Sequence, residues 1–313
     1  SAFVYRCSIL GINKAHIGMM NPNVWMYLSS YEKLRQWIIK EKTLTNLVEL
    51  PLTGFSGATV QICSYNFINT FCSAYKGAYI RLVNFKGAEE EMCEYTIRAN
   101  KNPDCGYFYK ISSSEFNKIP GSPIAYWVND NIRQAFIKGT QIGKISAPRK
   151  GNTTTDNNRF IRFWLEVSRE KCAFDFKSSI EIKQLGLKWV PYNKGGGYRK
   201  WYGFNEFLVN WFDNGKEIKE IPHSVIANEQ YFFKPGLTWS TVTSKKFSIR
   251  KFGYGYIFDN GGCCIFGEDS ILDNLLLFMN SIVFEKLYSD LNPTLNFQSG
   301  DVAKVPFIEP NVE

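Results

Sequence analysis

Apolar and polar residues alternate along the first 85 positions in a way that predicts both helices and strands. Leu34, Trp37 and Ile38 share one face of a helix expected over residues 31–40, and the two serines before it can cap its first turn. Three β-type runs predict strands at residues 43–50, 58–67 and 78–83. This alternation indicates part of an open sheet with helices packed on it, over residues 1–85.

The pattern changes beyond residue 85. Acidic and mixed sequence predicts a connector over residues 86–143. From residue 144 the chain shows short β-type runs separated by Gly- and Asn-rich turns, and a wide apolar face predicts a final helix over residues 270–290. We therefore expect a mixed α+β fold, in which residues 144–313 form a mainly β domain with a C-terminal helix.

Composition places the chain among ordinary globular proteins. Of its 313 residues, 44% are hydrophobic and 21% are charged, which argues against disordered and fibrous classes. The longest apolar stretches, such as Leu275–Met279, are far shorter than the roughly 20 residues of a membrane span. The first residues, Ser1–Arg6, lack the pattern of a signal peptide. We therefore expect a cytoplasmic protein with no membrane partner.

Cysteine and histidine usage argues against metal and triad chemistry. The eight cysteines include no C-x-x-C pair, and His16 and His223 are the two histidines of the chain. A zinc site is therefore not favoured, and neither histidine lies in a context typical of a nucleophilic triad. Unpaired cysteines of this kind indicate a reducing compartment.

The positive charge is concentrated in one region. The formal net charge is +8, but residues 144–255 carry 20 Lys and Arg against 10 Asp and Glu, a net charge of +10. A basic region that also contains many aromatic residues is typical of nucleic-acid binders, because cations that neutralise phosphates release counterions. A solvated basic surface is an equally good interpretation of the charge alone.

Three segments combine hydroxyl or amide side chains with basic and aromatic residues, at positions 151–164, 189–203 and 236–250. In the first segment, Asn can pair with adenine, Arg with guanine, and Thr with phosphate or a thymine methyl group. The second places a glycine turn between basic and aromatic residues, and glycine allows a polymer to approach the backbone closely. For each segment alone, a surface hairpin is at least as good an interpretation.

Together these segments carry a resemblance to a known family. The segments Trp25–Arg35 and Ile119–Trp127, with the Asn-Arg-Phe, Lys-Gly-Gly and Arg-Lys-Trp-Tyr-Gly words of the basic region, resemble adenine-specific DNA methyltransferases. These are the enzymes of phage-growth-limitation (BREX) defence systems, which are related to the fused methyltransferase-specificity enzymes of restriction-modification. The resemblance covers nearly the whole chain, and residues 291–302 resemble the end of a target-recognition domain.

The resemblance implies a parent enzyme that binds S-adenosylmethionine, flips an adenine out of the duplex and methylates its amino group. It also implies that residues 1–85 are the last strands of a Rossmann-like methyltransferase sheet and residues 144–313 a target-recognition domain. Such chemistry needs an F-x-G-x-G turn and an N-P-P-Y loop. Phe55–Thr59 imitates the first, while Asn21–Val24 and Asn292–Leu295 imitate the second, but each is incomplete and is interpreted as a decoy.

We therefore expect a chain that recognises double-stranded DNA without methylating it, with no catalytic residue and no bound S-adenosylmethionine of its own. The expected contacts to bases or backbone are Thr154, Thr155, Asn157 and Arg159. The expected phosphate contacts are Lys194, Arg199, Lys200, Lys245, Lys246 and Arg250. Trp201 and Tyr202 either pack against a sugar or lie in the core, and the core is favoured.

Two alternatives stay open at this point. The first is a non-catalytic specificity or scaffold subunit that docks on a separate catalytic subunit or on other defence-system proteins. The second is a carbohydrate-binding β-domain, which would also be rich in aromatic residues and asparagine. The concentrated positive charge argues against the second alternative, because glycan binding gains little from it.

Overall fold

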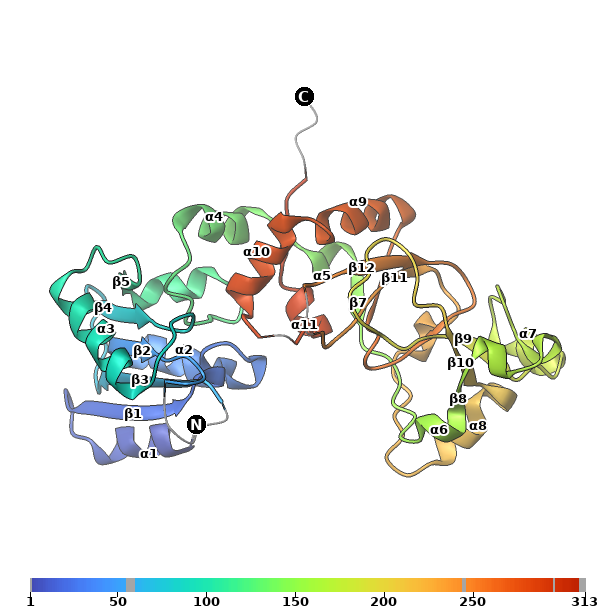
Figure 1. Ribbon diagram of the computed structural model, residues 1–313, viewed down its shortest axis with the longest axis horizontal. Coiled ribbons are helices and arrows are strands. Elements are labelled where there is room, and N and C mark those ends of the chain that lie inside the picture. Colours follow the sequence, from blue (N-terminus) through green and yellow to red (C-terminus); the bar gives the residue numbers. More distant parts are fainter. Residues whose placement is uncertain (1, 55–59, 244–245, 295, 310–313) are drawn as a thin grey trace. The chain divides into compact units, whose positions relative to one another are not determined.

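The computed structural model describes residues 2–54, 60–243, 246–294 and 296–309. The chain divides into two compact units, the first made of residues 1–137 and 290–292 and the second of residues 138–289 and 293–313. Both units mix helices with small sheets (Figure 1). The expected mixed α+β fold class is thereby confirmed in its general form. The boundary at residue 138 lies close to the expected start of the second domain at residue 144.

Unit 1 is built from one sheet and the helices that flank it. Its strands are β1 (His16–Pro22), β2 (Thr43–Glu49), β3 (Ile62–Ile68), β4 (Lys76–Arg81) and β5 (Phe108–Ser112). Its helices are α1 (Ala2–Leu10), α2 (Glu32–Glu41), α3 (Glu89–Lys101) and α4 (Asp130–Lys138), with short 3₁₀ turns η1 (Asn23–Met26), η2 (Ser29–Tyr31) and η3 (Ser113–Lys118). The helix expected over residues 31–40 and the three expected strands are thus all present, within a few residues of their predicted bounds.

The sheet of unit 1 has the strand order β1-β3-β2-β4-β5. Strand β3 is antiparallel to both of its neighbours, β2 and β4 are parallel, and β5 is antiparallel to β4. It follows that β1, β2 and β4 run in one direction. The chain leaves β1, passes through α2 and returns in β2 with the same direction, which is a βαβ crossover within a mixed sheet.

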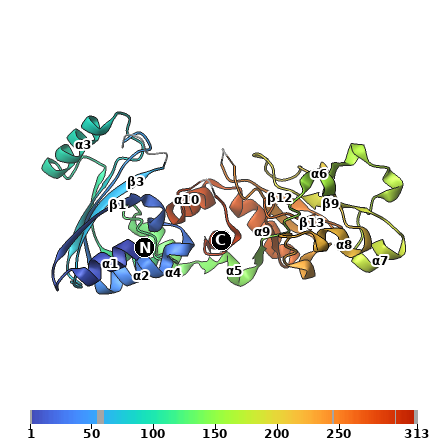
Figure 2. The same ribbon diagram turned by 90° about the horizontal axis from the view of Figure 1, so that it is seen from below.

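Each face of this sheet carries its own apolar cluster. Val4 of α1 and Ile38 of α2 pack with Leu47, Tyr65 and Tyr79 of the strands. On the opposite face, Met92 and Ala99 of α3 pack against Ile80 and Leu82, since neighbouring strand residues point to opposite faces. Figure 2 shows α1 and α2 on one side of the sheet and α3 on the other.

A buried carboxylate organises the end of strand β2. Glu49 is 1% exposed and accepts hydrogen bonds from Tyr27 Oη (2.5 Å), Tyr126 Oη (2.9 Å) and Asn23 Nδ2 (2.9 Å). The Arg81 guanidinium lies 3.8 Å from the same carboxylate. A charged carboxylate is tolerated in such a place only because several donors and a cation surround it. Burial, with Glu49 nearby, raises the pKa of both phenols well above their usual value.

Residues 86–137 are part of unit 1, so the expected connector over residues 86–143 is not seen. Helix α3 covers one face of the sheet, and β5 pairs with β4 along five residues. Tyr126 stacks on Tyr79 with ring centroids 4.9 Å apart, which anchors the segment Ile119–Trp127 in the core. The polar surface of α3 concealed this role in the sequence, because only Met92 and Ala99 of that helix are fully buried.

Unit 2 consists of short strands with small helices between them. The strands are β6 (Thr140–Gln141), β7 (Ala147–Arg149), β8 (Ile161–Phe163), β9 (Trp189–Asn193), β10 (Phe207–Asn210), β11 (Gly236–Trp239), β12 (Ile249–Phe252), β13 (Ile257–Phe258), β14 (Cys264–Phe266) and β15 (Pro306–Phe307). The helices are α5 (Ile142–Ile145), α6 (Asn157–Phe160), α7 (Ser179–Gln184), α8 (Phe212–Glu220), α9 (Asp269–Met279), α10 (Ile282–Leu291) and α11 (Ser299–Val302), with 3₁₀ turns η4 (Trp164–Glu166), η5 (Arg169–Lys171) and η6 (Glu229–Tyr231).

Two four-stranded sheets form the centre of unit 2, with the orders β13-β9-β10-β8 and β12-β11-β14-β7, and β15 pairs with β6. Their inner faces share one aromatic core, which includes Trp211, Phe232, Phe258 and Phe266. The high aromatic content noted in the sequence is therefore largely used in packing. The helices of unit 2 take up more of the described residues than its strands do, so the region is mixed α+β and the expected mainly β character is not borne out.

The final helix expected over residues 270–290 is split into α9 and α10 by Asn280 and Ser281 (Figure 1). The Asn280 side chain accepts from the backbone N of Ile249 and donates to its carbonyl oxygen, as a neighbouring strand would. Ser281 Oγ accepts from Phe284 N and so begins the second helix. The continuous apolar pattern could not reveal this break, because it arises from hydrogen bonds to β12.

Candidate nucleic-acid interface

The first basic segment leaves strand β7 and forms helix α6. Asp156 caps this helix, since its Oδ1 accepts from Arg159 N at 3.0 Å. The cap exposes Asn157 and Arg159 on the surface, whereas Thr154 is buried, with 1% of its surface exposed. Thr155 is exposed and has a φ of 60°, in the left-handed region that lets the chain turn into the helix.

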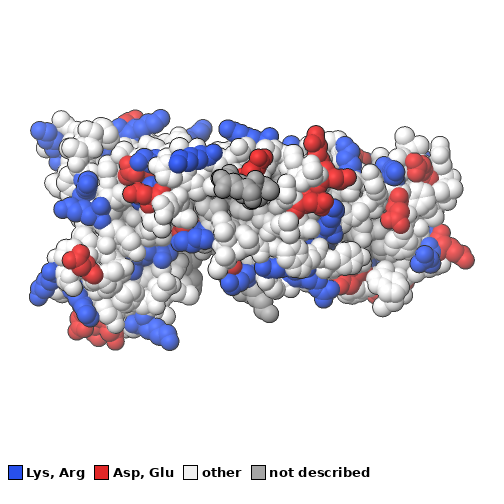
Figure 3. All heavy atoms as spheres, turned by 90° about the horizontal axis from the view of Figure 1, so that it is seen from above, with Lys and Arg blue, Asp and Glu red and all other residues white. Residues whose placement is uncertain are grey.

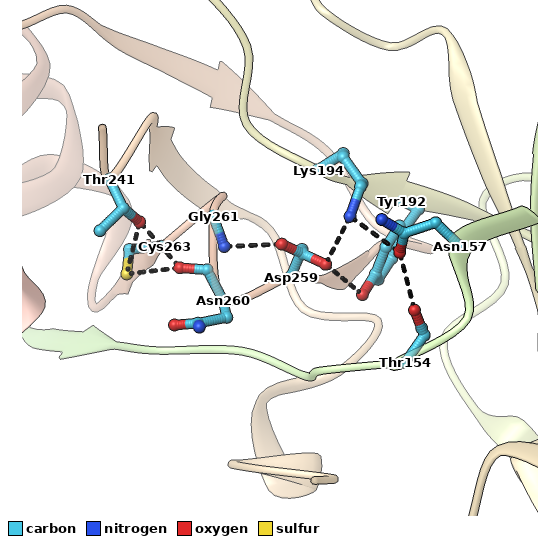
Figure 4. A network of polar contacts seen from close by, with 9 residues as sticks. All are labelled: Thr154, Asn157, Tyr192, Lys194, Thr241, Asp259, Asn260, Gly261 and Cys263. Atoms are coloured by element: carbon cyan, nitrogen blue, oxygen red, sulfur yellow. Dashed lines mark hydrogen bonds and ion pairs between the residues drawn. The ribbon is translucent and has the colours of Figure 1, made fainter. Parts of the chain in front are cut away.

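The first and second segments meet in a polar network (Figure 4). Lys194 directly follows strand β9, and its Nζ donates to Asn157 Oδ1 and to Asp259 Oδ2, both at 3.1 Å. Thr154 Oγ1 donates to the same Asn157 oxygen at 2.8 Å. Three stretches that lie far apart in the sequence are therefore joined at one lysine.

The buried carboxylate of Asp259 fixes this network in place. It is 7% exposed, and its Oδ2 also accepts from Tyr192 Oη at 3.0 Å, while its Oδ1 accepts from Gly261 N at 2.6 Å. Burial, followed by the adjacent Asp259 carboxylate, raises the pKa of Tyr192 well above its usual value. The phenol is thus a fixed donor, and the carboxylate has a partner on each oxygen.

The second and third segments also lie side by side. Gly196 N donates to Ser240 Oγ at 2.9 Å, and Arg199 N donates to Ser248 Oγ at 3.1 Å. Trp201 N then donates to Ile249 O at 3.0 Å, which ties the second segment to strand β12. All three segments selected from the sequence are therefore neighbours in unit 2.

The first glycine of the turn in the second segment, Gly195, is needed for backbone packing. Gly195 has a φ of 86°, and a Cβ built there would lie 2.3 Å from Gly261 O. Glycine is required because the two backbones approach each other and the conformation is left-handed. Gly196 and Gly197, in contrast, are exposed. The predicted approach of a polymer backbone to this turn is thus restricted to its last two glycines.

The structure separates the predicted phosphate contacts by exposure. Arg199 is exposed, and Lys246 is exposed but pairs with Glu285 at 3.1 Å. Lys200 is half-buried and donates to Asn280 O. Lys245 lies outside the described residues.

The predicted phosphate contact at Arg250 is corrected, because its side chain is 1% exposed and a phosphate cannot reach it in this arrangement. Its Nη1 donates to Arg199 O, and burial lowers its pKa to about 10. Thr154 is likewise too buried for a direct DNA contact, and its hydroxyl donates to Asn157 instead. Both residues are removed from the set expected to touch DNA directly.

The two aromatic residues of the second segment that were expected either at a sugar or in the core lie on the surface, whereas the sequence favoured the core. Trp201 is 48% exposed and Tyr202 is 69% exposed. Trp201 has a φ of 73°, which is a strained conformation for a bulky residue, and backbone hydrogen bonds to β12 hold it there. The structure therefore leaves both rings available for stacking on a ligand.

An open groove of about 300 Å³ runs beside the polar network. Asn157 and Lys194 lie on its wall together with Arg162, Phe163 and Phe207. Arg159, at the end of α6, is exposed and pairs with Glu217 at 3.4 Å. The groove thus combines cations, amides and aromatic surface with one carboxylate, that of Glu166. On the face shown in Figure 3, basic side chains of unit 2 are interspersed with acidic ones rather than gathered in a single patch.

Sequence reasoning did not single out Asp259, Tyr192 or Arg162. Asp259 begins an Asp-Asn-Gly-Gly turn directly after strand β13, and an acidic residue at the start of such a turn commonly accepts from backbone amides two positions on. That local pattern was a usable signal. Nothing in the sequence indicated that the same carboxylate would reach Lys194, which is 65 positions away.

Comparison with known proteins identifies relatives along almost the entire chain. The adenine-specific methyltransferase BrxX of Escherichia coli O9:H4 (strain HS) is 34% identical over 298 residues, which are 93% of this chain and 23% of that protein. This chain is a homologue of part of such methyltransferases. PglX of Lacticaseibacillus casei (strain Zhang), also an adenine-specific methyltransferase, is 30% identical over 98% of this chain and 26% of that protein. The resemblance seen in the sequence is confirmed.

The chain spans about a quarter of the length of these curated relatives. No family model matches it. Among solved structures, the type IIL restriction-modification enzyme MmeI, determined in complex with DNA, matches with a TM-score of 0.50 at 11% identity. The match covers 95% of this chain and 40% of that enzyme. It shows a shared fold with restriction-modification enzymes and nothing further.

The two segments that imitate an N-P-P-Y loop are built into the fold. Asn21 and Pro22 end strand β1, and Asn23 is buried, with its amide committed to Glu49 and Gln61. Asn292 is likewise buried, with 2% of its surface exposed. The segment Phe55–Thr59 lies outside the described residues.

Across the described ranges, no three His, Cys, Asp or Glu side chains gather as metal ligands would. None of the helices that the structure describes is both long and apolar enough to cross a bilayer.

Proposed function

We propose that unit 2 recognises double-stranded DNA on behalf of an adenine-specific DNA methyltransferase of a phage-defence or restriction-modification system. The observation that carries this proposal is the similarity to BrxX and PglX over 93–98% of the chain. The groove lined by Arg162 and Lys194 supports it, because cations beside exposed amide and aromatic side chains suit a nucleic acid. MmeI, whose fold the chain shares, was determined in complex with DNA, which agrees with the same ligand.

The proposal gives the two units different tasks. The βαβ crossover and mixed sheet of unit 1 would be the C-terminal part of a Rossmann-like methyltransferase sheet. S-adenosylmethionine would be bound, and methyl transfer carried out, by parts of the whole protein that this chain does not supply. The candidate DNA contacts are Thr155, Asn157, Arg159, Arg162, Arg199, Lys246, Trp201 and Tyr202, all of which are at least partly exposed.

The test is duplex-DNA binding by the 313-residue chain across a salt series, with transfer from labelled S-adenosylmethionine measured in the same samples. We expect the logarithm of the binding constant to fall linearly with the logarithm of the salt concentration. We expect no methyl transfer. Absence of binding at low salt would exclude DNA recognition and favour a scaffold that docks on other defence-system proteins. Methyl transfer by this chain alone would refute the assignment of catalysis to other parts of the protein.

A further inference from the structure

The orientation of the Asn157 amide is fixed by its neighbours. An ammonium group has donors and no acceptor, so the Asn157 atom that faces Lys194 Nζ at 3.1 Å must be the carbonyl oxygen. Thr154 Oγ1 donates to the same oxygen at 2.8 Å. A carbonyl oxygen has two lone pairs, and both are engaged (Figure 4).

The other end of the amide is available. Within the described part of the chain, no side chain or backbone group is a partner of Asn157 Nδ2, and the residue is exposed on the wall of the groove. Asn157 therefore offers hydrogen-bond donors outward and no acceptor. Paired recognition of adenine would need its oxygen as an acceptor for the N6 amino group, and that oxygen is already in use.

Lys194 is placed to hold this orientation rather than to meet a phosphate. Its side chain is 24% exposed, and its ammonium group binds Asp259 and Asn157 together. Asp259 is in turn fixed by Tyr192 Oη and Gly261 N. The positive charge is largely compensated by this buried carboxylate, which weakens any contribution to phosphate binding.

We infer that Lys194 and Asp259 are positioning residues that make Asn157 a pure donor, which selects a base edge bearing acceptors. In the major groove the edges that present acceptors without an amino group are those of guanine, with O6 and N7, and thymine, with O4, whereas adenine places its N6 amino group beside N7. This inference rests on the proposed DNA-recognition function. It replaces the expected phosphate role of Lys194 with a role in sequence preference.

The experiment is selection of preferred sequences from a pool of randomised duplexes, followed by salt-dependent binding to the selected duplex. For wild type we expect guanine or thymine at the position read by Asn157. Lys194→Met should lower the preference there by about fivefold or more, with an unchanged salt slope. Asn157→Asp keeps an inner oxygen for Lys194 but turns an acceptor outward, so the preference should move to cytosine or adenine, whose amino groups donate.

Lys246→Met serves as the comparison, because Lys246 is an exposed lysine outside this network. A phosphate contact removed in this way lowers the salt slope and leaves sequence preference intact. The inference is overturned if Lys194→Met behaves like Lys246→Met, or if Asn157→Asp retains the wild-type preference. Loss of all DNA binding by wild type would instead refute the proposed function itself. Asn157→Asp is informative even if Lys194→Met does not fold, because Asn157 is a surface residue.

Discussion

Two arginines of the basic region offer a direct test of which cations meet DNA. Arg199 and Arg250 both lie against the ring of Phe204, at 4.9 and 4.8 Å from its centroid. Arg199 is exposed, whereas Arg250 is 1% exposed and donates to the backbone oxygen of Arg199. The two residues share charge, shape and neighbourhood, and they differ in access to a phosphate.

The expected effect of removing Arg199 follows from counterion release. One lost phosphate contact on duplex DNA reduces the slope of log affinity against log salt by about 0.9. When the salt concentration rises fourfold, the affinities of wild type and of Arg199→Ala for DNA both fall. The fold-loss of affinity of Arg199→Ala should be about 3.5 times smaller than the fold-loss of wild type. Arg250→Met removes the same charge from a buried place and should leave the slope unchanged.

Fluorescence anisotropy of a labelled duplex at several salt concentrations measures both slopes, and circular dichroism establishes that each variant is folded. An Arg199→Ala slope equal to that of wild type would show that this exposed arginine does not contact phosphate. A reduced slope for Arg250→Met would show that the buried arginine becomes exposed on binding. Either result would refute the use of exposure to choose between these cations.

Three further predictions concern stability. Glu49→Ala should lower the free energy of unfolding by about 3–5 kcal/mol, because it leaves buried donors without an acceptor, and Glu49→Gln by less; urea denaturation compares them. Burial raises the pKa values of Tyr27, Tyr126 and Tyr192 in the folded state above the usual value of about 10. Their contribution to the free energy of unfolding is therefore fully present below about pH 10 and is lost as the pH rises beyond it. A urea midpoint that stays constant as the pH is raised from about 8 to about 11 would contradict this. Gly195→Ala should lower the melting temperature measurably, since its Cβ would meet a backbone oxygen, and an unchanged melting temperature would show that the turn can relax.

Local signals in the sequence predicted much of unit 1 and less of unit 2. Helix α2 and strands β2, β3 and β4 follow from local apolar patterns, and β3 shows the regular alternation of buried and half-buried residues that such a pattern predicts. The break at Asn280 was not predictable from periodicity, since it depends on hydrogen bonds to Ile249 in another strand. The polar surface of helix α3 predicts a connector, because few of its residues carry the apolar pattern of a helix that covers a sheet.

The candidate site shows the same division between local and tertiary information. The sequence indicated Asn157 and Lys194 from their residue types, and these types alone suggested an adenine contact and a phosphate contact. The positioning role inferred for Lys194 changes both interpretations through one carboxylate, because Asp259 holds Lys194 and Lys194 takes the oxygen of Asn157. A residue type determines which hydrogen bonds are possible, whereas the buried partners determine which of them are left for a ligand. Sequence preference in this domain should therefore depend on residues that never touch DNA.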